Sequence, residues 1–338
     1  MNSRKTLVSA LLSALMVLSV PQAQAQSPLT LSVWLPTAHP VPQALLKWTQ
    51  ELEQASNGRL KAQLLSKPVT APPGTYNAVR DGLADISFTV LGYTPGRFTL
   101  SEFVELPLMS STAEQGSVAF HRVANKHKAV MDEYREVKVL ALFVHGPGVI
   151  MNSKKELMSV SDMQGLKFRV GGGIVNDVTK ALAINSTLKP AGDSYELMST
   201  GVMDGTWLPV EGITTFKLDK VVRHVTTVPG GIYNSAFIAM MNKKTYDGLS
   251  KEDQALVDKT SGENLARMLG RGFDSRDREG KALAQASGIK VATAPDAMVK
   301  EIASKVGALE EKWMNAARAK GIAQPDAVLA DFRAEAKK

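Results

Sequence analysis

The sequence predicts an α/β protein with two lobes and a ligand-binding cleft between them. Short β-prone runs alternate with helical runs, an order typical of mostly parallel sheets covered by helices. The alternation restarts after Gly146-Pro147-Gly148, which indicates a second α/β unit. The chain has 338 residues, more than one hydrophobic core usually supports. Clefts between such lobes bind ligands at strand ends, where loop amides and helix N-termini converge.

The N-terminus is typical of a secretory signal peptide. Two positive charges precede the apolar run 7–20, and the small-residue pattern Ala23-Gln24-Ala25 follows it. The apolar run is shorter than the ~20 residues that a membrane-spanning helix needs. We therefore expect a signal peptide over 1–25, cleaved after Ala25, and export to the periplasm. A lipoprotein anchor is excluded because the chain has no cysteine.

The first α/β unit follows the signal. Its β-prone runs are 29–35, 59–65, 85–90 and 138–144. Its helical runs are 41–56, 75–83, 112–126 and 128–137, and 92–98 is a loop set by Pro95-Gly96. In the first helix Leu45, Trp48 and Leu52 share one stripe, and Asn57-Gly58 ends it.

The second unit repeats the alternation and passes into a helical C-terminal third. Its β-prone runs are 149–152, 167–170 and 187–190, and its helical runs are 174–182 and 195–203. A further β-prone run, 236–241, follows Pro229-Gly230-Gly231. The segments 250–285 and 295–320 have continuous helical periodicity. Trp48 and Trp313 lie on helical stripes, so we expect both in the core.

Composition excludes several functions. The net charge of +7 comes from Lys and Arg spread along helices, without the basic and aromatic clusters of nucleic-acid-binding proteins. A mild positive field would attract anionic solutes. The absence of cysteine removes disulfides, thiolate nucleophiles and cysteine metal sites together.

The sequence also lacks the common motifs of enzymes and cofactor sites. It has no G-x-S-x-G elbow, no P-loop and no H-E-x-x-H. The five histidines are scattered without metal-ligand spacing. We therefore expect no cofactor, no metal and no catalysis. A periplasmic enzyme acting on an acid would need a general acid or base near Arg169, for which only His145 or Asp204 could serve.

Arg169 is the most informative polar residue. It lies in the β-prone run 167–170, directly before Gly171-Gly172-Gly173, which opens a helical run. A guanidinium and backbone N–H groups at a helix N-terminus together suit a carboxylate. A solvent-facing strand arginine would give the same local sequence.

Four stretches of the chain carry a resemblance to a known protein family. They are PTAHP (36–40) with SNGRLK (56–61), VRDGLADISFTVLGYTPGRFTLSEFVELPL (79–108), SVSDMQGLKFRVGGG (159–173), and DSYELMSTGVMDG (193–205) with LSKEDQALV (249–257). In this order the chain resembles the substrate-binding subunits of tripartite ATP-independent periplasmic (TRAP) transporters. The resemblance spans nearly the whole mature chain.

The resemblance implies a two-lobe periplasmic binding protein fold with crossing strands and a long bridging helix. It implies a small organic-acid ligand, bound through the carboxylate by Arg169, and delivery to TRAP membrane permease subunits. A binding protein that feeds a sensor kinase would have the same sequence features. The implied divisions are a signal peptide over 1–25, lobe I over 26–145 plus about 235–273, lobe II with the bridging helix over 146–234 plus about 274–325, and a C-terminal helix over 326–338.

Two departures from the family pattern bear on the ligand. Leu208 stands where members often have a ligand-supporting Asn, and Gly148 falls where many carry a second arginine. We therefore expect the pocket to contain one positively charged side chain, that of Arg169, and to have less polar walls than is usual in the family. We expect a monocarboxylate with an apolar or aromatic body, because buried polar groups of a hydroxylated ligand would lack partners.

The remaining candidate wall residues come from the expected lobe edges. Besides Arg169 and Leu208 they are Trp34, His39, Phe88, Thr89, His145, Gly171, Trp207, Tyr233 and Asn234. For each aromatic residue, packing in a lobe core is the alternative. His39 could instead cap the helix that starts beside Pro40.

Overall fold

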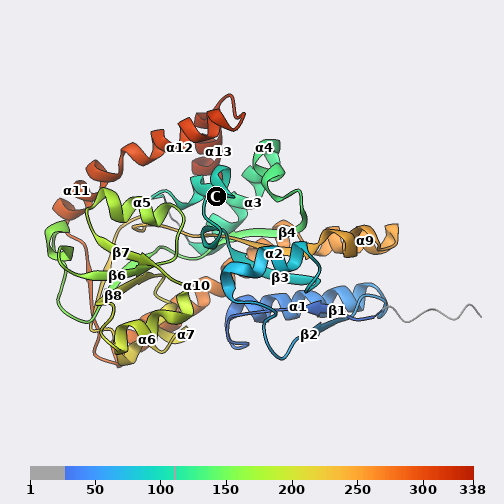
Figure 1. Cartoon of the computed structure of the whole chain (residues 1–338), viewed down its shortest axis with the longest axis horizontal. Coiled ribbons are helices and arrows are strands. Elements are labelled where there is room, and N and C mark those ends of the chain that lie inside the picture. The colour runs from blue at the N-terminus through green and yellow to red at the C-terminus, as the bar shows by residue number, and fades with distance from the viewer. Residues whose placement is uncertain (1–26, 110–111) are drawn as a thin grey trace, which may run out of the picture.

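The computed structural model describes residues 27–109 and 112–338. Figure 1 shows two sheets side by side, each flanked by helices, as the sequence predicts for a two-lobe α/β protein. The expected signal peptide over 1–25 lies outside the described residues. Within them, no helix has both the length and the hydropathy to span a bilayer.

Lobe I contains a five-stranded sheet. Its order is β2 (Ala62–Leu64), β1 (Leu29–Leu31), β3 (Ile86–Val90), β10 (Ala236–Asn242) and β4 (Val137–Val144). Only β10 runs against the other strands. The helices around it are α1 (Pro40–Ala55), α2 (Thr75–Arg80), α3 (Ala113–Lys126), α4 (Lys128–Met131), α8 (Lys243–Asp247) and α9 (Lys251–Thr260).

Lobe II contains a six-stranded sheet, in which only β5 runs against the others. Its order is β11 (Lys290–Thr293), β9 (His224–Thr227), β5 (Val149–Asn152), β8 (Gly205–Leu208), β6 (Lys167–Val170) and β7 (Asn185–Leu188). Its short helices are α5 (Ile174–Ala181), α6 (Ser194–Ser199) and α7 (Gly212–Thr215). Strand β7 ends two residues before the predicted end, because Pro190 cannot donate a ladder hydrogen bond.

Three connections join the lobes at their centre. The segments between β4 and β5 and between β9 and β10 are hydrogen-bonded to each other, from Gly148 N to Tyr233 O (3.0 Å) and from Ile232 N to Gly148 O (3.1 Å). The third connection is α10 (Glu263–Ala286), which packs on α1 and α3 and, further along, on α7 and β11. Two helical glycines permit this close packing. A Cβ on Gly270 would meet the α3 backbone at 2.6 Å, and one on Gly280 would meet Val210 O at 2.4 Å.

Two predicted continuous helices are broken, which corrects the sequence analysis. The segment 250–285 divides into α9 and α10 at Ser261-Gly262, where Gly262 has φ +68°, a conformation that glycine adopts without strain. The segment 295–320 divides into α11 (Asp296–Val306) and α12 (Ala308–Ala319) at Gly307. Hydrophobic periodicity alone does not detect breaks of this kind.

Both tryptophans expected in the core are buried. Trp48 Nε1 donates to Thr260 Oγ1 at 3.1 Å, and Trp313 Nε1 donates to the Thr99 carbonyl at 3.1 Å. A buried indole N–H usually finds such a partner. Trp313 thereby fixes α12 to the 3₁₀ helix η3 (Thr99–Glu105) of lobe I.

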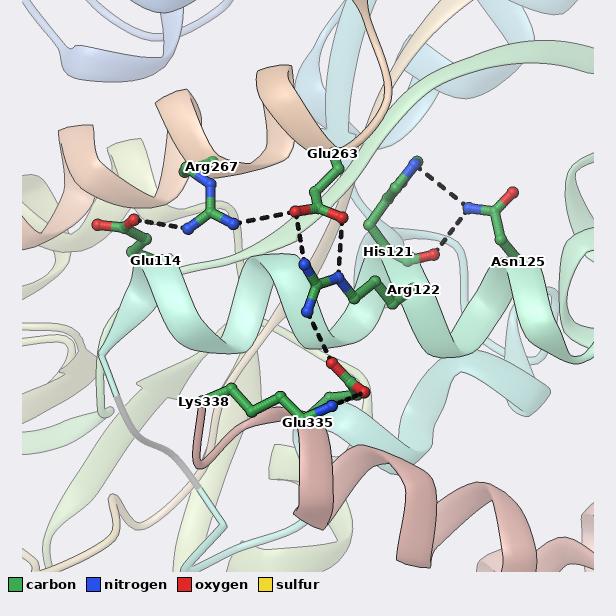
Figure 2. Close-up of polar contacts among 8 residues, drawn as sticks. All are labelled: Glu114, His121, Arg122, Asn125, Glu263, Arg267, Glu335 and Lys338. Carbon is green, nitrogen blue, oxygen red and sulfur yellow. Dashed lines mark hydrogen bonds and ion pairs between the residues drawn. The ribbon is translucent and has the colours of Figure 1, made fainter.

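The C-terminal helices return from lobe II to lobe I. Helix α11 packs against α5, α12 against η3, and α13 (Pro325–Glu335) against α3. Figure 2 shows the polar contacts that hold this end: Arg122 on α3 pairs with Glu263 of α10 and with Glu335 of α13, at 2.8 Å in both cases. Helix α13 also buries Val328, Leu329 and Phe332.

Candidate ligand-binding site

A pocket lies between the lobes and is lined by residues of both. Clefts between lobes are common sites for small molecules. Its walls are mainly apolar and aromatic, with Trp34, Phe237 and Phe273 from lobe I and α10, and Leu208 from lobe II.

Arg169 supplies the positive charge of the cavity. It lies on β6 and is 1% exposed. Its Nε donates to the Lys189 carbonyl (2.8 Å) and its Nη1 to the Trp207 carbonyl (3.3 Å), which orient the guanidinium without neutralising it. No described carboxylate forms an ion pair with Arg169. Because an uncompensated buried charge is costly, a carboxylate from outside the protein would be strongly favoured here.

The two lobes touch around this cavity, so the structure is closed. Tyr93 Oη of lobe I accepts a hydrogen bond from Ala191 N of lobe II at 2.9 Å. The backbones of Gly92 and Gly172 are so close that a Cβ on Gly92 would lie 2.7 Å from the Gly172 carbonyl carbon. These contacts require the lobes to be together.

A second contact between the lobes joins His39 and Glu211, both in the cavity wall. His39 caps α1: its Nδ1 accepts from Val41 N at 3.1 Å, so its Nε2 carries the hydrogen that faces Glu211 Oε2 at 3.3 Å. Burial alone would raise the pKa of Glu211, but the adjacent His39 and the Thr215 hydroxyl bring that pKa below its usual value. Both sequence-based readings of His39, cap and cavity wall, therefore apply.

Glu105 forms a third contact between the lobes. This lobe I carboxylate accepts from Ile174 N at the start of α5 in lobe II (2.9 Å) and from Ala236 N (2.8 Å). A carboxylate at a helix N-terminus is electrostatically favoured. Burial nevertheless raises the pKa of Glu105 to about 8, against the effect of the two N–H donors.

These buried carboxyl groups predict a pH-dependent stability. Burial raises the pKa of Glu105 to about 8 and the pKa values of Glu102, Glu133 and Asp277 to about 7. In the unfolded chain these carboxyl groups titrate near pH ~4, so between pH 6.5 and 8.5 they release protons only in the folded state. The free energy of unfolding should therefore fall as the pH rises through this window.

Urea unfolding at pH 6.5 and 8.5 measures this effect. Glu105→Gln should reduce the difference between the two midpoints, whereas Glu156→Gln, at an exposed position, should leave it unchanged. A midpoint that does not fall between pH 6.5 and 8.5 would contradict the prediction.

Seven of the predicted site residues line the cavity. They are Trp34, His39, His145, Arg169, Gly171, Leu208 and Tyr233. The other four predicted residues are close to the cavity but do not line it: Phe88, Thr89, Trp207 and Asn234.

Each of these four has another structural position. Phe88 is buried behind Trp34, with ring centroids 5.1 Å apart, and its carbonyl accepts from Trp34 Nε1 at 3.1 Å. Trp207 is in the core beside Phe168 and offers only its carbonyl to Arg169. Thr89 is buried in β3, and Asn234 Oδ1 accepts from Ser235 N in the crossing segment.

Gly148 explains why a second arginine is missing at this position. A Cβ on Gly148 would lie 2.3 Å from the Tyr233 ring and 2.8 Å from the Tyr233 carbonyl oxygen. The aromatic ring occupies the space that a side chain at 148 would need.

Six polar or aromatic wall residues were not predicted from the sequence: Tyr93, Glu211, Phe216, Ser235, Phe237 and Phe273. Three of them show why. Tyr93 lies in the 3₁₀ turn η2 (Leu91–Tyr93), Glu211 precedes α7, and Phe273 is on α10. Only Tyr93 had a usable signal, because it follows the end of a predicted strand by three residues. No group of three or more described His, Cys, Asp or Glu side chains could hold a metal ion.

This geometry is that of a binding protein whose lobes close over a small solute. The chain belongs to the bacterial extracellular solute-binding proteins of family 7, whose family model matches residues 31–318. Proteins of this family are periplasmic subunits of TRAP transporters and work with membrane permease subunits.

Individual relatives cover almost the whole chain. A TRAP periplasmic solute-binding protein from Bordetella bronchiseptica, solved with bound (R)- and (S)-mandelate, is 40% identical with a TM-score of 0.89, covering 92% of this chain and 99% of that one. One from Rhodoferax ferrireducens, solved with copurified benzoate, is 27% identical with a TM-score of 0.85, covering 92% and 98%. The outer membrane transporter protein TsaT of Comamonas testosteroni is 30% identical over 338 residues, 99% of each chain.

Proposed function

We propose that the mature protein, 26–338 after cleavage behind Ala25, captures an aromatic monocarboxylate in the periplasm and delivers it to a TRAP permease. The observation that carries this proposal is the buried guanidinium of Arg169, which has no carboxylate partner among the described residues and lies in a mainly aromatic cavity. The mandelate and benzoate bound by the two relatives are acids of this kind.

The charge distribution supports a ligand with one carboxylate. Among the described residues, Arg169 is the single Lys or Arg in the cavity wall, whereas Glu211 adds a negative charge to it. A second carboxylate on the ligand would meet Glu211 without a cation to balance it. We therefore expect dicarboxylates to bind poorly.

The proposal includes no catalytic step. Of the two residues that could have served as acid or base, Asp204 precedes β8, at the opposite end of that strand from Leu208. Its carboxylate accepts from Lys167 N (2.9 Å) and pairs with Lys154 (3.5 Å). Burial lowers the pKa of His145 to about 4, far from the pH at which a periplasmic base would act.

A thermal-shift screen tests the proposal. Mature protein is unfolded and refolded to remove carried-over ligand, then screened against aromatic, aliphatic and keto acids, dicarboxylates, sugar acids and amino acids. A ligand at about 100 times its Kd stabilises the folded state by about 2.7 kcal/mol, which raises the Tm visibly. We expect shifts with aromatic monocarboxylates. Shifts restricted to dicarboxylates or neutral sugars would contradict the proposal.

A further inference from the structure

His145 has a fixed tautomer. It directly follows β4, lines the cavity and is 4% exposed. Its Nδ1 lies 2.5 Å from the Gly146 carbonyl oxygen. A carbonyl oxygen only accepts, so Nδ1 carries the hydrogen. The other ring nitrogen, Nε2, is then a hydrogen-bond acceptor.

The ring remains neutral under all ordinary conditions. Burial lowers the pKa of His145 to about 4; the nearby charge of Arg169 acts in the same direction, while Glu211 and the Gly146 carbonyl oppose it. Above pH ~5 the Nε2 lone pair is therefore free to accept.

Nε2 has no hydrogen-bond partner among the described residues. Three aromatic side chains surround the His145 ring. The ring centroids of Tyr233, Phe237 and Phe273 lie 5.3, 6.0 and 6.3 Å from the centroid of the imidazole. A buried acceptor without a donor is unfavourable, and such groups in native proteins usually have a partner. His145 lines the cavity, so a ligand that carries a hydrogen-bond donor would supply the missing partner.

Within the part of the chain that the structure describes, the neighbouring wall offers a second acceptor and no further cation. Glu211 lies in the same cavity and its carboxylate is held ionised by His39 and Thr215. Arg169 therefore suits a carboxylate, whereas His145 and Glu211 suit an uncharged group that donates a hydrogen.

We propose that the physiological ligand is a hydroxylated aromatic monocarboxylate whose hydroxyl group donates a hydrogen bond to His145 Nε2. This inference rests on the proposed function, because Arg169 must hold the carboxylate. It departs from the expectation, drawn from Leu208 and Gly148, that a ligand hydroxyl would lack a partner in the pocket. The structural reason is the unpartnered Nε2 of His145.

Matched ligand pairs test the inference by isothermal titration of refolded protein. The pairs are mandelate with phenylacetate and 3-hydroxybenzoate with benzoate, which differ only in the hydroxyl. O-methylmandelate retains the oxygen but cannot donate. In at least one pair we expect the hydroxylated acid to bind about tenfold more tightly. If the mandelate pair shows this preference, O-methylmandelate should lose it.

Variants assign the preference to His145. His145→Phe keeps an aromatic ring among aromatic neighbours and should bring the affinity ratio of the pair close to one. His145→Gln retains an acceptor and should keep part of the ratio. This variant provides the test if the Phe variant does not fold. His224→Phe, a matched substitution outside the cavity wall, should keep the full ratio. Arg169→Ala should weaken both members of a pair and leave the ratio largely intact.

Three results would overturn the inference. Equal affinities of the wild-type protein for both members of each pair would overturn it, and so would a preference that persists in His145→Phe. Either result would leave the proposed function standing. Absence of binding by every aromatic acid would overturn the inference and the proposed function together.

Discussion

Arg169→Ala should raise the Kd for an aromatic carboxylate ~30-fold or more. Removing one partner of a buried, hydrogen-bonded charge pair costs about 2–5 kcal/mol, and the described cavity wall has no second cation to replace Arg169. Isothermal titration of refolded protein measures the change. Arg318→Ala, which removes an exposed arginine of α12, is the control and should bind as the wild type does.

Arg169→Lys should restore only part of the affinity. The guanidinium holds the Lys189 and Trp207 carbonyls with two of its nitrogens and can still present N–H groups to the ligand. An ammonium group is a point charge without this planar fork. If Arg169→Ala kept its Kd within about threefold of the wild type, the assignment of Arg169 to the ligand carboxylate would be wrong.

Gly92→Val should weaken ligand binding tenfold or more by preventing closure. A Cβ on Gly92 would lie 2.7 Å from the Gly172 carbonyl carbon and 2.8 Å from Gly173 N, and these are backbone atoms that cannot rotate away. The clash lies between the lobes, so the open protein can accept the side chain. A ligand then loses the contacts that exist only in the closed state.

Titration and small-angle X-ray scattering together test this effect. The wild type should become more compact with ligand, whereas Gly92→Val should not, although its ligand-free Tm should change little. Gly192→Val is the control, because a Cβ there meets nothing within 4 Å. Gly172 is less suitable, since its φ of +84° adds backbone strain to any substitution. Normal compaction of Gly92→Val would show that closure does not need this close approach.

The sequence predicted the parts of the fold that have strong local signals. The apolar strands β3, β4 and β10, the stripe of α1 and the break between the two α/β units all followed from periodicity and turn residues. Strands β9 and β11 were missed, although β5 and β6, which are equally short, were predicted. The β11 run, Lys290–Thr293, is largely exposed and has little hydrophobic pattern.

The residues of the site, like the elements of the fold, were predictable only where the sequence carries a signal. Arg169 was predicted from its position before three glycines together with the family resemblance, because the local sequence alone also fits a solvent-facing strand arginine. Glu105 had no local signal, since its partner Ile174 lies in the other lobe and only the closed arrangement brings them together. Phe88 and Trp207 were placed at the cavity because they are near strand ends, but their rings pack on Trp34 and Phe168 instead.

The position of β10 in the lobe I sheet has a consequence for synthesis and secretion. This strand lies between β3 and β4 and pairs with residues about 100 to 150 positions earlier in the chain. A growing polypeptide therefore cannot complete its first sheet until both central crossings and most of the second lobe have left the ribosome. Pairings that are this remote form slowly. Slow completion would suit the signal peptide expected over 1–25, which directs a chain to export.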